Sequence, residues 1–126
     1  MARQVVHFYS AVYNSQRLVK MISDLRDDLD AKDVPFVVGN LGTFIETHSH
    51  FPFANDINQQ LDDLPNKVVN CLCASSEGLG HIGDYVHFDR NSQIEFGKRY
   101  AEKIRLLVFT YDAGNEKQGG FTLKCN

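Results

Sequence analysis

The feature that most constrains the fold is a pair of short apolar runs, residues 36–38 and 67–74, each preceded by a helical pattern. Residues 13–29 place apolar side chains at three- and four-residue spacing, and residues 54–64 repeat this over a shorter length. A further amphipathic helix is expected after the second run. Helices that alternate with strands buried on both faces are typical of parallel α/β sheets. We therefore predict an α/β fold with a short parallel sheet.

The last expected helix has its own start signal. Asp89 or Ser92 can cap it, and Glu95 follows Ser92 at the spacing of a capping box. The apolar stripe of this helix is expected to consist of Ile94, Gly97, Ala101 and Ile104.

Both ends of the chain carry strand-like sequence. Residues 4–9 are β-prone but short, and residues 106–111 form a similar run near the C-terminus. Gly119 and Gly120 indicate a turn, after which residues 121–123 could pair back on the chain. The sequence therefore predicts a C-terminal hairpin.

Composition narrows the classes of partner. The chain has 126 residues, enough for one domain over residues 1–126, and 43% of them are hydrophobic. A net charge of −3 gives no basic surface for nucleic acid or an anionic membrane, and no apolar run could span a bilayer. Three cysteines do not suggest a disulfide framework, and the N-terminus lacks the apolar core of a signal peptide. We expect a cytoplasmic protein in a reducing compartment.

The chemistry of the chain is predicted to lie in residues 83–89, the stretch Gly-Asp-Tyr-Val-His-Phe-Asp. Asp84 stands three residues before His87 in a glycine-rich loop, so its carboxylate can fold back onto the imidazole Nδ1–H. Nε2 would then be free to act as a base. The loop follows the second apolar run, and ligands of parallel sheets bind beyond the carboxyl ends of the strands. Asp84 and His87 are the predicted catalytic residues; a pair that only orders the loop and caps the next helix is the alternative interpretation.

Other polar clusters have simpler interpretations. Ser75 and Ser76 lie near His87 in the sequence and could supply a nucleophile, but a polar turn at a strand end is the better interpretation. The segment His48-Ser49-His50, together with His81, could share a metal. No carboxylate pair or cysteine stands at ligand spacing, so ordinary loop residues are expected and no metal or cofactor is predicted.

Several spaced motifs resemble one family. Residues 13–26 and 33–42 look like the middle of the SGNH-type carbohydrate acetylesterases, the group of sialate O-acetylesterases and acetylxylan esterases of carbohydrate esterase family six. The resemblance covers residues 11–105 and leaves residues 106–126 as an extra tail. Further motifs follow in the order of the family: Phe51-Pro52-Phe53-Ala54, Leu64-Pro65-Asn66, Asp84-x-x-His87-Phe88-Asp89, Ser92-Gln93, Phe96-Gly97 and Arg99-Tyr100-Ala101.

The resemblance implies a partial flavodoxin-like fold with three α/β/α layers, and it makes Asp84 and His87 the acid and base of a Ser–His–Asp triad. The family usually has glycine where Tyr85 stands. Its nucleophile lies in a Gly-x-Ser turn near the start of the domain, and no Gly-x-Ser occurs in this sequence. The chain thus resembles the C-terminal half of an enzyme that removes acetyl groups from sugars or polysaccharides. It is expected to be inactive without a complementary N-terminal half. The alternative is a non-catalytic truncated module that serves binding or homodimer assembly.

Overall fold

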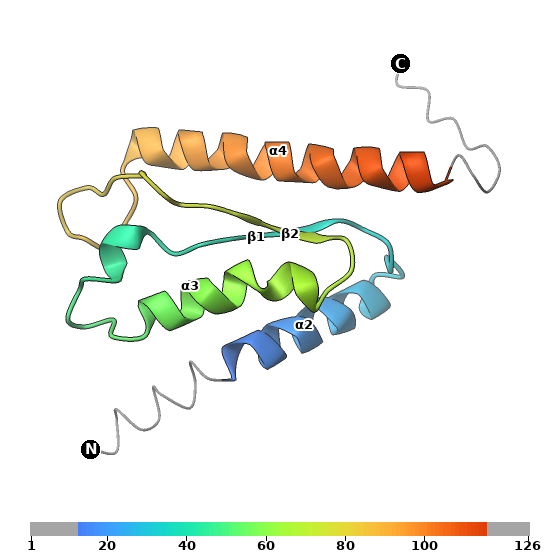
Figure 1. Cartoon of the computed structure of the whole chain (residues 1–126), viewed down its shortest axis with the longest axis horizontal. Helices are drawn as coiled ribbons and strands as arrows, with labels where there is room; N and C mark the ends of the chain where they lie inside the picture. Colours follow the sequence, from blue (N-terminus) through green and yellow to red (C-terminus); the bar gives the residue numbers. More distant parts are fainter. Residues whose placement is uncertain (1–12, 116–126) are drawn as a thin grey trace.

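The computed structural model describes residues 13–115, with side chains described up to residue 109. Over this range, helices alternate with two strands that pair in parallel (Figure 1). The elements are α2 (Asn14–Asp28), β1 (Phe36–Gly39), the 3-10 turn η1 (Thr43–Ile45), α3 (Ala54–Asp62), the 3-10 turn η2 (Leu64–Asn66), β2 (Cys71–Ala74) and α4 (Arg90–Asn115). The predicted α/β fold with a short parallel sheet is confirmed. None of the helices in this range is long and apolar enough to cross a membrane.

The elements form three layers. α4 lies against one face of the sheet, while α2 and α3 pack together on the other (Figure 1). The core lies between the sheet and these two helices. Its members come from both helices, both strands and the segment that joins α3 to β2: Ile22, Val38, Leu61, Leu64, Val68 and Cys71. The α/β/α arrangement implied by the resemblance is therefore present in partial form.

The position of α4 depends on the absence of a side chain at Gly39. A Cβ built there would lie 2.6 Å from Cζ of Phe96 and would also collide with the hydroxyl of Tyr100. Leu107, further along α4, is buried. The two rings and Leu107 therefore form the face of α4 that packs on the sheet.

The apolar stripe predicted for the last helix is wrong. Ile94 and Ile104 are 52% and 40% exposed. A Cβ added at Gly97 would meet no atom within 4 Å. α4 carries apolar residues on two faces. The face with Phe96 and Tyr100 packs on the sheet, because Gly39 has no side chain to collide with these two rings. The other face, here named the outer stripe, consists of Ile94, Gly97, Ala101, Ile104 and Val108.

The predicted C-terminal hairpin is also wrong. Residues 106–111 belong to α4, which continues as a helix to its end at Asn115. Leu107 is only 8% exposed, so burial against the sheet outweighs the β propensity of this run. Residues 121–123, the expected second strand of the hairpin, lie outside the described residues, and so do residues 4–9.

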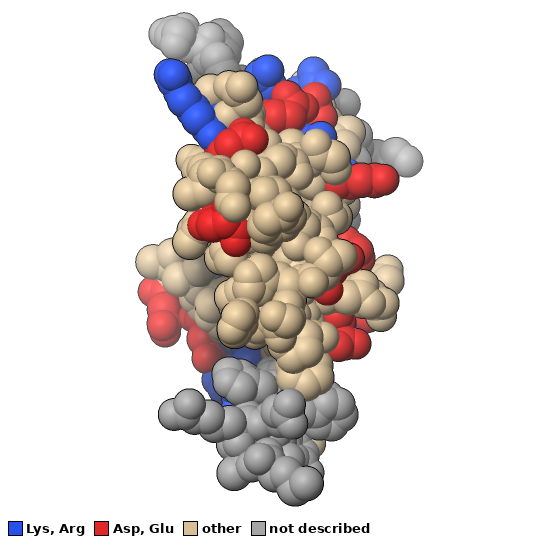
Figure 2. Space-filling view, turned by 90° about the vertical axis from the view of Figure 1, so that its left-hand side faces the viewer, with Lys and Arg blue, Asp and Glu red and all other residues tan. Residues whose placement is uncertain are grey.

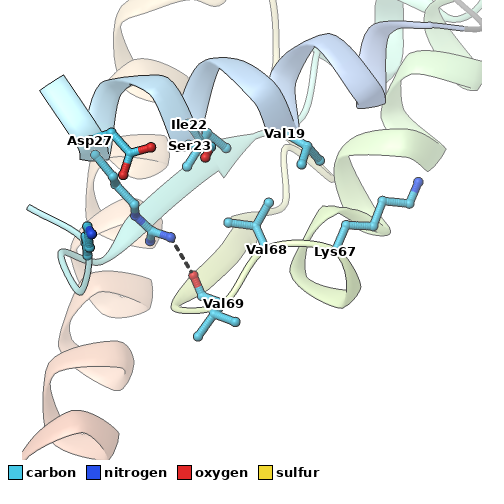
Figure 3. A pocket seen from close by; sticks show the side chains of 9 residues that line it. Val19, Ile22, Ser23, Asp27, Lys67, Val68 and Val69 are labelled. Atoms are coloured by element: carbon cyan, nitrogen blue, oxygen red, sulfur yellow. Dashed lines mark hydrogen bonds between the residues drawn. The ribbon is translucent and has the colours of Figure 1, made fainter.

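The second strand is shorter than the predicted residues 67–74: β2 begins only at Cys71. Asn70, just before it, has a left-handed backbone with φ of 52° and ends a turn. Arg26 of α2 stabilises this turn by donating a hydrogen bond to the carbonyl of Val69 (Figure 3). It also donates to the carbonyls of Asn70 and Val34. Beside the turn, an open hollow of about 330 Å³ lies between α2 and the residues that lead into β2.

Candidate active site

The loop between β2 and α4 carries the predicted site residues. It leaves the carboxyl end of β2 and folds back on itself through an antiparallel bridge between His81 and Phe88. The N–H of Asp89 donates to the carbonyl of Gly80 at 3.2 Å and closes the base of the loop. Gly83 has φ of +108°, a conformation that glycine adopts without strain. Backbone hydrogen bonds thus order the loop, which lies at the carboxyl end of the strands, as predicted from the sequence.

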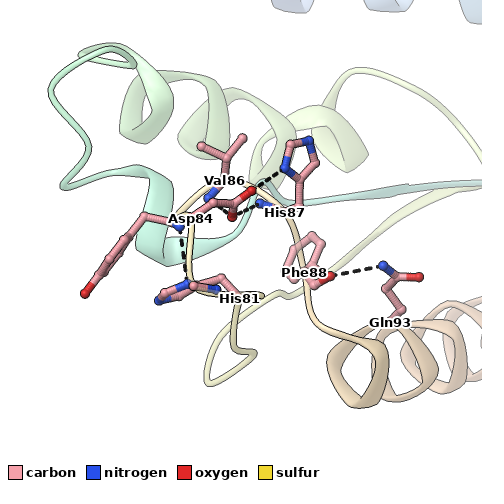
Figure 4. Close-up of polar contacts among 8 residues, drawn as sticks. His81, Asp84, Val86, His87, Phe88 and Gln93 are labelled. Carbon is pink, nitrogen blue, oxygen red and sulfur yellow. Dashed lines mark hydrogen bonds and ion pairs between the residues drawn. The ribbon is translucent and has the colours of Figure 1, made fainter.

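Asp84 and His87 meet within this loop. Asp84 Oδ2 lies 2.6 Å from His87 Nδ1. Asp84 Oδ1 accepts the backbone N–H groups of Val86 and His87 at 2.9 and 3.0 Å (Figure 4). One carboxylate oxygen therefore orders the loop while the other orients the imidazole. This is the geometry that the spacing predicted, and the catalytic role of the pair stays a prediction.

The protonation of the pair follows from its hydrogen bonds. They hold the pKa of Asp84 well below its ordinary value; the backbone N–H of His87 contributes most, then the His87 side chain and the N–H of Val86. An ionised carboxylate only accepts hydrogen bonds, so His87 Nδ1 carries the proton. In the neutral ring Nε2 then keeps its lone pair. The His87 side chain is 72% exposed, which leaves room for another group to approach it.

Asp89 connects the loop to α4. Its Oδ1 accepts the N–H of Ser92 at 2.7 Å, and this hydrogen bond is the main reason why the pKa of Asp89 is lowered. Ser92 Oγ accepts the N–H of Gly80 at 2.7 Å. Gln93 Nε2 donates to the carbonyl of Phe88 at 3.0 Å (Figure 4). Of the two predicted caps, Asp89 is the one used, and Ser92 instead binds the loop to the helix.

The serines near His87 serve the turn after β2. Ser76 is 1% exposed, and its hydroxyl donates to the carbonyl of Leu41 at 2.6 Å. Ser75 Oγ accepts the N–H of Glu77 at 3.1 Å. These contacts form the polar turn that the sequence indicated.

The loop histidines form no metal cluster. The rings of His48 and His50 lie 5.1 Å apart, and His48 Nδ1 accepts the N–H of His50. His81 Nδ1 accepts the N–H groups of Gly83 and Tyr85 at 3.0 and 3.2 Å. Across residues 13–115, no group of three or more His, Cys, Asp or Glu side chains is placed to hold a metal ion.

Sequence reasoning missed a buried amide that shapes this end of the sheet. Asn58 of α3 is 6% exposed. Its Oδ1 accepts the N–H of Leu41 at 2.7 Å, while its Nδ2 donates to the Leu41 carbonyl and to Glu46 Oε1. The amide thereby holds the loop after β1. The only signal in the sequence is an asparagine on the same helix face as Ala54 and Leu61.

The loop end of the molecule is poor in positive charge. Residues 40–53 and 75–89, which form its two loops, contain no Lys or Arg. Figure 2 looks onto this end: its middle is uncharged, Asp and Glu lie beside it, and most of the visible Lys and Arg gather at the level of α4. The two loops themselves are therefore neutral to acidic, and the nearby Arg99 of α4 donates hydrogen bonds to the carbonyls of Ser75 and Glu77.

A parallel α/β layer with an Asp–His pair beyond the strand ends is typical of hydrolases built on α/β folds. The sequence comparison narrows this class. The chain belongs to the family described as carbohydrate esterase, sialic acid-specific acetylesterase, which it matches over residues 7–105. The resemblance to carbohydrate acetylesterases is thereby confirmed. No curated protein matches the chain at a significant level.

Proposed function

We propose that this chain is the base-bearing part of a carbohydrate O-acetyl ester hydrolase that works with a serine supplied from outside its sequence. The observation that carries the proposal is the Asp84–His87 pair, 2.6 Å apart at the carboxyl end of parallel strands, with the imidazole exposed. Membership of the family supports an acetylated carbohydrate as the substrate.

In the proposed reaction, His87 Nε2 takes the proton of the serine hydroxyl as the serine oxygen attacks the acetyl carbonyl. The ester bond to the sugar then breaks, and His87 returns the proton to the departing sugar oxygen. Water hydrolyses the acetyl-serine by the same route and releases acetate. Asp84 stabilises the imidazolium in both steps, and its lowered pKa keeps it ionised at neutral pH.

The chain alone is proposed to be inactive. Ser76 Oγ donates to the carbonyl of Leu41 in the loop after β1, and Ser75 Oγ accepts the N–H of Glu77. A single oxyanion-hole donor is worth about 3–4 kcal/mol of transition-state stabilisation. Without a nucleophile and those donors, an oriented base contributes little acceleration.

The proposal is tested by mixing the chain with a polypeptide that carries the upstream half of the family fold, and by following p-nitrophenyl acetate hydrolysis. The mixture should turn over, and His87→Ala should lower kcat at least about a thousandfold. His50→Ala, a second exposed loop histidine, is the matched control and should change kcat less than about twofold. A mixture without turnover, or turnover that survives His87→Ala, would contradict the proposal.

A second candidate function is that of a non-catalytic assembly module. The observation that favours it is the outer stripe of α4, where Ile94, Ile104 and Val108 are 40–52% exposed. Exposed apolar rows on a helix mark contacts with another chain. Light scattering decides between a monomer, which would contradict this role, and a homodimer that Ile104→Glu dissociates.

A further inference from the structure

Tyr85 has a backbone conformation that its side chain disfavours. Its φ is 58°, in the left-handed region. Within the described part of the chain, the other non-glycine residues with positive φ are Asp30 and Asn70, whose short polar side chains tolerate this region. Strained positions concentrate at binding and catalytic sites, where the strain is retained because the side chain is needed. The tyrosine at this position therefore needs a functional explanation.

The ring of Tyr85 is both exposed and held in place. The residue is 55% exposed, and its ring packs against that of His81 with centroids 4.1 Å apart and planes inclined by 33°. His81 is itself fixed, because its Nδ1 accepts the N–H groups of Gly83 and Tyr85. A ring that is already positioned loses little conformational entropy when a ligand stacks on it.

A row of packed rings connects Tyr85 to the interior. His81 packs on Phe44 at 5.1 Å, and Phe44 packs on Phe88 at 5.3 Å between ring centroids. The row then continues through Phe96 to Tyr100 at Gly39. Tyr85 is the outer end of this row, so the packing of the inner rings does not require it. Its own ring face is available to a ligand.

We propose that Tyr85 is a substrate-binding residue of the same site, on which the ring of an uncharged acetylated sugar stacks. This inference rests on the function proposed above. Tyr85 stands between Asp84 and His87 in the sequence, so a sugar stacked on its ring would be bound by the same loop that carries the base. The apolar C–H face of a pyranose matches an aromatic face, as in other mostly apolar ligand sites with few polar groups. Neither loop at this end contains a Lys or Arg, so neither loop itself offers a cation to the carboxylate of an acidic sugar.

The experiment measures binding by the full chain alone, with an O-acetylated methyl xyloside as the probe and ligand-observed NMR as the readout. Tyr85→Phe keeps the ring and should bind like wild type. Tyr85→Gly and Tyr85→Asn fit the left-handed backbone without an aromatic face, and they should weaken binding at least about tenfold. Both should melt no lower than wild type, because they relieve strain. An O-acetylated sialic acid should bind at least about tenfold more weakly than the xyloside.

Binding of the xyloside by Tyr85→Gly at wild-type strength would overturn the proposal, and so would absence of binding by the wild type. Loss of binding accompanied by a lower Tm in both Tyr85→Gly and Tyr85→Asn would assign the tyrosine a structural role instead. Equal binding of the sialic acid would overturn the preference for an uncharged ring. None of these readouts requires turnover, so they stand apart from the outcome of the complementation assay.

Discussion

Replacing Gly39 by alanine tests how α4 is placed on the sheet. The new Cβ would lie 2.6 Å from Cζ of Phe96, well inside the ordinary carbon contact of about 3.5–4.0 Å. Phe96 cannot move freely, because its ring packs between those of Phe88 and Tyr100. Overpacking of this kind costs about 1–3 kcal/mol in the free energy of unfolding. For a chain of 126 residues, this corresponds to a fall in Tm of about 4–12 °C.

Gly97→Ala is the matched control for this prediction. It makes the same chemical change inside α4, where a Cβ meets nothing within 4 Å. Alanine is favoured over glycine in a helix interior by about 0.8–1.0 kcal/mol, so Tm should rise by about 3–4 °C. Thermal unfolding followed by circular dichroism gives both values, and urea unfolding gives the free energies. A Gly39→Ala protein as stable as wild type, or equal shifts in the two variants, would refute the close approach of α4 at Gly39.

Three further predictions concern single groups. Asp84, whose pKa is lowered in the folded chain, stabilises the fold above its unfolded pKa of about 4, and this contribution is lost as pH falls below that value. The stability difference between wild type and Asp84→Asn should therefore shrink on acidification, and a constant difference in urea midpoints would contradict this. Burial raises the pKa of Cys73 to about 12, so in a Cys125→Ser chain this thiol should react with a disulfide reagent at mildly alkaline pH only after denaturation. Asp89→Ala should lose about 0.5–2 kcal/mol in urea unfolding, whereas Asp89→Asn keeps the capping acceptor and most of the stability.

Local sequence signals were enough to predict the helices α2 and α3 themselves. The spacing places Ile22 and Leu61 in the core, as the structure shows. Other apolar residues of the same pattern in α2 are exposed: Met21, Leu25 and Leu29. The contact of Asp84 with His87 was predictable for a similar reason, since three residues in a glycine-containing loop allow the carboxylate to reach the ring. In the Asp84–His87 contact, residues close in sequence carry the whole interaction.

Features that depend on contacts between residues far apart in the sequence could not be predicted in this way. The two faces of α4 are both apolar, and the choice between them is made by Gly39, far away in the sequence. Residues 106–111 look like a strand until the burial of Leu107 on the sheet is known. Asn58 carries no mark of its role as the amide that holds the loop after β1, because its partners come from another segment.

The outer stripe of α4 bears on whether a second copy or a complementary half covers the chain. Full burial of one large aliphatic side chain contributes about 1.5–3 kcal/mol, and Ile94, Ile104 and Val108 are already about half buried, so covering them adds roughly 3 kcal/mol for each chain. When the stripes of two copies cover each other, the gain is roughly 6 kcal/mol. Association costs an estimated 4–15 kcal/mol in lost translational and rotational freedom, so a contact through the stripes alone offsets only the low end of this cost. The described sheet has only β1 and β2, so each strand has an unpaired edge, and strand pairing there would add hydrogen bonds and apolar burial. A complementary half can cover both the stripe and the edge of β1 while bringing a serine to His87. A second copy joined through α4 covers only the outer stripe and leaves the edge of β1 unpaired. The complementary half therefore buries more of the exposed surface and is the better partner.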